Sequence, residues 1–235
     1  MRRMIRMRNI FETIKRKDVG SIGIGAMIVF IAMVLVAGIA ASVLIQTSTK
    51  LETQAMKSGQ ETIAEVSTGI AVYDIEGKIN NSDIGMLAIT VRTRAGSANI
   101  DLNETVLMMS DGTKKVLLTY YGWSNGYLYN SSVDSDGQLF GTGCYNKSGW
   151  INLTNDYFGI IVLEDQDGSC TQTNPIINRG DKVALTVNCS AGKVFNREIP
   201  ERTDVFGYVF PEHGSPGVIA FTTPASYNDN IIDLQ

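Results

Sequence analysis

The side chains that most often do chemistry are scarce in this 235-residue sequence. His213 is the one histidine and stands in the loop-like run Pro-Glu-His-Gly-Ser-Pro-Gly, so a Ser-His-Asp triad would depend on it alone. The sequence has no nucleophile elbow, phosphate-binding loop or HExxH motif. The spacing of Cys144, Cys170 and Cys189 matches no zinc site. We therefore predict that the chain is not an enzyme, and that it carries no cofactor and no metal site of histidine and cysteine.

Carboxylates gather in two turns, Asp134-Ser135-Asp136-Gly137 and Asp165-Gln166-Asp167-Gly168. Clustered carboxylate oxygens suit calcium, but neither turn completes the EF-hand pattern. The preference of Asp and Gly for turns explains both runs without a metal. We expect no metal here, with calcium as the weaker alternative.

Six asparagines stand in Asn-X-Ser/Thr sequons, in which X is not proline. In an exported chain such sequons accept N-linked glycans, mostly in surface loops. Asn188 lies in a predicted strand and fits this expectation least. The candidate glycosylation sites are Asn80, Asn103, Asn130, Asn146, Asn152 and Asn188.

Residues 22–45 form an apolar stretch in which Ser42 is the only residue that is neither apolar nor glycine. As a helix this stretch would span about 36 Å, enough to cross a hydrocarbon layer of roughly 30 Å. Small residues within it, such as Gly38 and Ser42, allow helices to approach closely. The stretch is therefore predicted to enter a membrane or to pack against other helices.

Apolar residues continue at helical spacing after this stretch, among them Leu51, Ile63 and Val66, while the opposite face is charged. No proline occurs before Pro175, so we predict one helix over residues 22–68. A membrane anchor alone would not need the amphipathic half, which must bury its apolar side against something. The candidate assembly residues are Ile28, Phe30, Leu35, Gly38, Ser42, Leu51, Ile63 and Val66.

Charge is divided unevenly along the chain, which carries −4 overall. The first 20 residues hold seven Lys or Arg against two acids, and the remainder has a net charge of −9. Basic residues beside a membrane span stay in the cytoplasm, so the C-terminal bulk is predicted to be exported, and its acidity argues against nucleic acid as a partner. In an exported compartment disulfides persist, and we favour a bond between Cys144 and Cys170. The apolar stretch could also end in an ordinary secretory cut near residues 40–42 or stay as an uncleaved anchor.

From residue 69 the sequence changes to short β-rich runs separated by Gly, Asn and Asp. Eight such runs predict an all-β sandwich of immunoglobulin-like type, so the fold class is α+β, a long N-terminal helix followed by a sandwich. A segment rich in Gly, Ser, Asn and Tyr interrupts the runs as a long insertion at about 122–155. The runs are residues 69–75, 83–95, 104–110, 114–121, 158–164, 181–189, 204–210 and 217–224.

The basic leader, Gly20 and the following SIGIGAMIVFIAMVLVAGIAASVLIQTS closely resemble the start of archaeal flagellins (archaellins), the type IV pilin-like subunits of the archaellum. The resemblance implies cleavage between Gly20 and Ser21 by a prepilin-peptidase-like enzyme. It divides the chain into a signal peptide at 1–20, a filament-core helix at 21–68 and an outer β domain at 69–235.

The resemblance also implies how such a chain would act. The subunit would be a membrane precursor, would be passed to the archaellum assembly platform, and would polymerise into an extracellular propeller for motility. The alternatives are an adhesive archaeal pilin and a cell-surface binding protein held by an uncleaved anchor.

Overall fold

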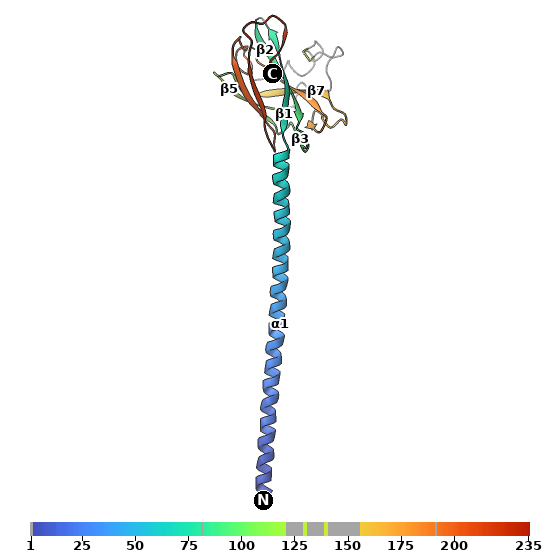
Figure 1. The fold of residues 1–235 in the computed structure, drawn as a ribbon, viewed down its shortest axis with the longest axis vertical. Helices are drawn as coiled ribbons and strands as arrows, with labels where there is room; N and C mark the ends of the chain where they lie inside the picture. The colour runs from blue at the N-terminus through green and yellow to red at the C-terminus, as the bar shows by residue number, and fades with distance from the viewer. Residues whose placement is uncertain (1, 81, 121–128, 131–138, 141–155, 191) are drawn as a thin grey trace. The chain divides into compact units, whose positions relative to one another are not determined.

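The computed structural model describes all residues except 1, 81, 121–128, 131–138, 141–155 and 191 (Figure 1). The chain divides into two compact units, residues 1–60 and residues 61–235. Part of the predicted insertion at 122–155 thus lies outside the described residues, and Cys144, Asn146 and Asn152 lie there too.

The N-terminal element is the helix α1 (Arg2–Ser67). Its end lies one residue before the predicted boundary at 68, but its start lies twenty residues before the predicted start at 22. The leader is helical as well because it is rich in Arg, Lys and Met, which favour helix, and it contains no proline. The helix therefore continues without a break across Gly20, where the sequence changes from basic to apolar residues.

The chain leaves α1 through a tight backbone contact within the second unit. The N–H of Ser215 donates to the carbonyl of Thr68 (2.9 Å), and the N–H of Ile70 donates to the carbonyl of Ser215 (3.2 Å). Gly214 has a φ of 96°, and a Cβ at this position would collide with the backbone of Thr68. Only glycine fits both the conformation and the space.

All eight predicted runs are strands, and four short strands accompany them. The eight are β1 (Ile70–Asn80), β2 (Asp83–Thr93), β4 (Val106–Ser110), β5 (Lys115–Tyr120), β7 (Tyr157–Glu164), β9 (Lys182–Asn188), β10 (Asp204–Phe210) and β11 (Gly217–Thr222). The additional strands are β3 (Ile100–Asp101), β6 (Tyr129–Asn130), β8 (Ile176–Ile177) and β12 (Ile231–Asp233). Strands of two or three residues have too little sequence to show alternation, so pattern reasoning does not find them.

Ten strands form one sheet in the order β11-β10-β4-β5-β7-β9-β2-β1-β12, with β6 beside β7; β3 and β8 pair separately. The pairs are antiparallel except β5 with β7 and β6 with β7. The sheet is curled (Figure 1). Its two ends come together, as shown by the N–H of Ala220 in β11, which donates to the side-chain oxygen of Gln235 beyond β12 (3.1 Å). The predicted α+β class, a long helix followed by a β domain, is confirmed.

The two halves of the curled sheet differ in how they are covered. In β10 and β5 buried and exposed residues alternate strictly, so one face packs on the core and the other is open. In β2 and β9 nearly every residue is buried, so both faces are covered. The shared core includes Phe158, Leu87, Leu107, Leu118 and Ile89, all fully buried.

Candidate functional site

The apolar part of α1 is uncovered in the single chain. Its large apolar side chains, from Ile22 at 72% exposed to Ile31 at 51%, are all mostly accessible. The described helix from residue 22 onward is long and apolar enough to cross a membrane, with a mean hydropathy of 3.0 in its most apolar window and none of that window buried. An isolated helix of this kind is unstable in water, so it needs lipid or protein around it.

The candidate assembly residues are likewise exposed in the amphipathic half, where Leu51, Ile63 and Val66 are 68, 70 and 78% accessible. Ile28, Phe30 and Leu35 are between 61 and 67% exposed in the apolar half. The chain therefore presents the whole predicted stripe, and no described residue of the same chain covers it. Contact of these residues with another subunit remains a prediction.

Glycines in α1 have no role in packing within the chain. A Cβ added to Gly38 or Gly59 would meet no other atom within 4 Å. Glycine within a helix costs about 1 kcal/mol relative to alanine, so these positions weaken the isolated helix without an intrachain benefit. Close approach by a second helix would use the space that they leave.

Polar side chains at the end of the apolar stretch and just after it are satisfied by the helix itself. Ser42 accepts a bond from the amide of Gln46 (3.4 Å), and the hydroxyls of Thr47 and Thr49 donate to the carbonyls of Leu44 and Ile45 (3.0 and 2.7 Å). Hydroxyls bonded in this way leave few hydrogen-bonding groups for the surroundings of the helix to satisfy. This arrangement suits a surface that other helices cover.

The predicted processing residues, Gly20 and Ser21, lie inside α1, where Gly20 is exposed. Nothing in the structure of the backbone distinguishes this bond from its neighbours. The structure therefore does not bear on cleavage there, which remains a prediction.

The described sequons fall into two environments. Asn80 is exposed, with its amide donating to Glu198 (3.0 Å), and Asn103 is exposed in the loop before β4. Asn188 is 8% exposed at the end of β9 and accepts a bond from the N–H of Ser190 (3.0 Å). Asn130 is in β6, and Asn146 and Asn152 lie outside the described residues. Accessibility thus favours Asn80 and Asn103 over Asn188 as glycan acceptors.

Cys170 and Cys189 are both buried. The proposed partner of Cys170, Cys144, lies outside the described residues, so that disulfide remains a prediction. Cys189 is fully buried, and burial raises the pKa of its thiol, as expected for an inert residue that packs as a small hydrophobe.

One of the two predicted acidic turns is described, and Asp181 joins it. Ligand oxygens of Asp165, Asp167 and Asp181 all lie within 4.8 Å of one another. Asp181 is buried, and burial followed by the charges of Asp165 and Asp167 raises its pKa, against hydrogen bonds that lower it. The turn is held by its own hydrogen bonds, including those from the N–H of Cys170 to Asp165 (3.1 Å) and from the amide of Asn178 to Asp167 (2.6 Å). Sequence reasoning missed Asp181, since it joins the turn only through the antiparallel pairing of β7 with β9, in which Glu164 stands opposite Lys182.

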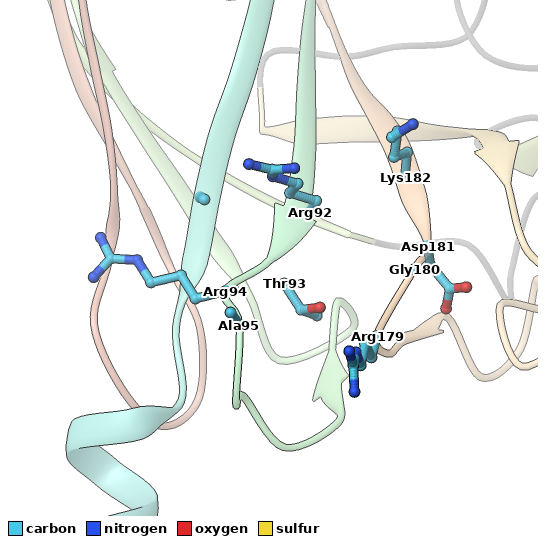
Figure 2. Close-up of a pocket in the computed structure, with 9 residues that line it drawn as sticks. Arg92, Thr93, Arg94, Ala95, Arg179, Gly180, Asp181 and Lys182 are labelled. Carbon is cyan, nitrogen blue, oxygen red and sulfur yellow. The ribbon is translucent and has the colours of Figure 1, made fainter.

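A second acidic group and a basic cleft were also missed. Asp74, Glu76 and Asp233 come together where β12 pairs with β1. A cleft of about 370 Å³ has Arg92, Arg179 and Lys182 around it, as Figure 2 shows. Arg92 lies over the ring of Tyr73 (5.1 Å), and Lys182 bonds Glu164 (2.9 Å). Arg92 lies in β2, Arg179 in the turn before β9 and Lys182 in β9, while Asp233 of β12 pairs with β1, so the sheet register is what brings each group together.

Comparison with known proteins agrees with this architecture. The family model for archaeal-type flagellin matches residues 20–221. The chain is 46% identical to flagellin B2 of Methanocaldococcus jannaschii, with 96% of this chain and 99% of that protein covered. It is 37% identical to flagellin B3 of Thermococcus kodakarensis, with 93% and 98% covered.

Solved structures show the same fold. The crystal structure of archaeal flagellin FlaB1 from Methanocaldococcus jannaschii aligns with a TM-score of 0.60 at 31% identity, covering 72% of this chain and 97% of that one. A structure of the archaeal flagellum of Methanospirillum hungatei aligns with a TM-score of 0.59 at 16% identity, covering 89% and 98%. The chain belongs to the archaeal-type flagellin family, the structural subunits of the extracellular archaeal flagellum filament, and it is not an enzyme.

Proposed function

We propose that residues 22–67 of α1 are the polymerisation element of this subunit, and that the filament forms by burying their apolar surface between neighbouring helices. The observation that carries the proposal is the uninterrupted exposure of this surface, including Leu51, Ile63 and Val66 beyond the membrane-length stretch. If each subunit buries several hundred Å² of it, at about 25 cal/mol per Å², the gain is on the order of 10 kcal/mol before entropy costs.

The subunit would reach this state from a membrane precursor. The apolar stretch would hold the precursor in the cytoplasmic membrane with the basic leader inside the cell, since the leader holds seven Lys or Arg beside the span, which the positive-inside rule keeps in the cytoplasm. A prepilin-peptidase-like enzyme would cut between Gly20 and Ser21, and the archaellum assembly platform would then transfer the helix into the growing filament. N-linked glycans would coat the outer domain at accessible sequons such as Asn80 and Asn103.

The N-terminus of the mature subunit tests this route. Sequencing filament protein is expected to give Ser21 as the first residue. Gly20→Phe should leave an uncut precursor in the membrane fraction and no filaments, whereas Gly25→Ala, a matched change within the mature helix, should be cut normally. A mature start at Met1 or near residue 42 would contradict the proposal.

A further inference from the structure

The middle of the open side of four adjacent strands, β11, β10, β4 and β5, is apolar. We call it the β10 face and define it by Met108, Leu117, Phe206, Tyr208, Phe210 and Val218. The sheet register makes these side chains neighbours: Tyr208 stands opposite Val218 on one side and Met108 on the other, and Met108 stands opposite Leu117. The rings of Tyr208 and Phe210 lie 5.6 Å apart. The face is therefore one continuous surface and not a scatter of single residues.

This surface is unusual for an antiparallel sheet that meets water, where the outward positions are normally polar. Phe206, Leu117 and Val218 are 57, 60 and 51% exposed, and Tyr208 and Phe210 are each 40% exposed. With about 150–250 Å² for each aromatic side chain, the exposed apolar area is on the order of 500 Å². A patch of this size is at the upper end of what monomeric proteins expose, and amounts to more than half of one partner's share of a standard interface of about 800 Å².

The described part of the same chain does not cover the face. The described residues of the insertion after β5 contact strands outside the face, since β6 (Tyr129–Asn130) pairs with β7. Phe140 is buried, and its carbonyl accepts a bond from Lys78 of β1 (3.3 Å). None of the six sequons falls within β4, β5, β10 or β11, so no glycan would be attached to these strands.

We propose that the β10 face contacts the β domain of a neighbouring copy of this chain in the filament, as a second interface in addition to the helices. A second copy is the occupant because the chain belongs to a family of filament subunits, in which each subunit is surrounded by others of its kind. The six residues that define the face are uncharged, which suits burial against protein, and the two charged residues on the same side, Asp204 and Lys115, stand at one end of it. All subunits of such a filament point the same way, so the contact is heterologous: the β10 face of one copy meets a different surface of the next.

This inference depends on the polymerisation proposed above, and a photo-crosslinking experiment separates the two. Benzoylphenylalanine replaces Tyr208, and assembled filaments are irradiated. The expected products are covalent dimers, with the adduct mapped to the β domain of a second chain, and no dimers once detergent has dissociated the filaments. Filaments without interchain products, or an adduct confined to residues 121–155 of the same chain, would overturn the inference while leaving polymerisation intact. Absence of filaments from the unmodified chain would instead overturn the polymerisation proposal.

A double variant measures what the contact contributes. Phe206→Thr with Tyr208→Thr keeps strand propensity but removes both rings, whereas Tyr73→Thr removes a ring that is 59% exposed on β1 outside the face. The double variant should still form filaments, but should release about tenfold more free subunit on mild heating, since buried aromatic residues dominate interface energetics. Its detergent-dissociated chain should unfold at the same temperature as the original. Equal release from the double variant and the original, or equal release from the double variant and Tyr73→Thr, would overturn the inference.

Discussion

Arg197 holds Asp111 through two bonds to one carboxylate oxygen, from Nη2 at 2.9 Å and from Nε at 3.1 Å. The Asp111 side chain is 2% exposed and also accepts bonds from the N–H groups of Thr113 (3.0 Å) and Lys114 (2.7 Å). The pair joins the β4–β5 turn to the loop before β10, segments 86 residues apart in sequence. The pair therefore stabilises the β domain by holding these two segments together.

Replacing Asp111 with Asn should destabilise the β domain by about 2 kcal/mol, because it removes the charge of a buried carboxylate and the oxygen that accepts both bonds from the half-exposed Arg197. Thermal unfolding of the detergent-dissociated chain measures the loss. Glu164→Gln is the matched control: its pair with Lys182 is similarly short at 2.9 Å but exposed, so its removal should have little effect. Equal losses from the two variants would contradict the stabilising role assigned to the Asp111–Arg197 pair.

The same carboxylate predicts a dependence on pH. Burial acts to raise the pKa of Asp111, but the hydrogen bonds from Lys114, Thr113 and Arg197 outweigh it and lower the pKa from 3.8 to about 2. A lowered pKa stabilises the folded state fully above pH 3.8, and this stability, about 2 kcal/mol, is lost as the pH falls toward 2. The unfolding temperature should fall over that window in the original chain and fall less in Asp111→Asn. Parallel curves for the two chains would contradict this prediction.

The carboxylates of Asp74, Glu76 and Asp233 predict a pH dependence of folding stability opposite to that of Asp111. Burial, followed by repulsion among the three, raises the pKa of Asp74 and Glu76. A raised pKa favours the folded state below the ordinary value, and that advantage is lost as the pH rises through the raised value. Asp233→Asn should therefore raise the unfolding temperature at pH 7 and leave it nearly unchanged at pH 3. A gain of the same size at both pH values would mean that repulsion is not the cause.

Gly214 is predicted to be the least replaceable glycine at the base of the β domain. Gly214→Ala places a methyl group against the Thr68 backbone at a positive φ, so we expect a loss of about 3 kcal/mol or more. Gly96→Ala also has a positive φ, 85°, but nothing lies within 4 Å of its Cβ, and it should lose only about 1 kcal/mol. Unfolding temperatures of both variants measure this difference. Equal losses from the two variants would mean that the positive φ, and not the contact with Thr68, determines the loss.

The sequence predicted elements better than it predicted their pairing. All eight long strands could be found because Val, Ile and Leu alternate with polar residues or run continuously between turn residues, and α1 because nothing interrupts it up to Ser67. The joining of Asp181 to Asp165, and of Arg197 to Asp111, depends on register and crossover, which a single sequence does not specify. The β10 face had a readable signal: Phe206, Tyr208 and Phe210 alternate with Val205, Gly207 and Val209, so a strand with apolar residues on both faces was visible before the sheet was known.

The amphipathic end of α1 gives the test that best separates a filament subunit from an anchored monomer. Val66 is 78% exposed in the single chain, so Val66→Asp should change the stability of the isolated subunit by less than about 0.5 kcal/mol. In a filament the same change would bury an unpaired charge in every subunit, at several kcal/mol each, and should eliminate filaments in negative-stain micrographs. Export and cleavage should continue, because the predicted cut at Gly20 is about 45 residues away, some 12 turns of helix.

Exchanging Lys57 and Glu61 alters charges on the polar face at i,i+4 spacing, and filaments should persist. Normal filaments from Val66→Asp would show that this part of the stripe is not a packing surface, and polymerisation would then have to rest on the apolar residues before Gln46 alone.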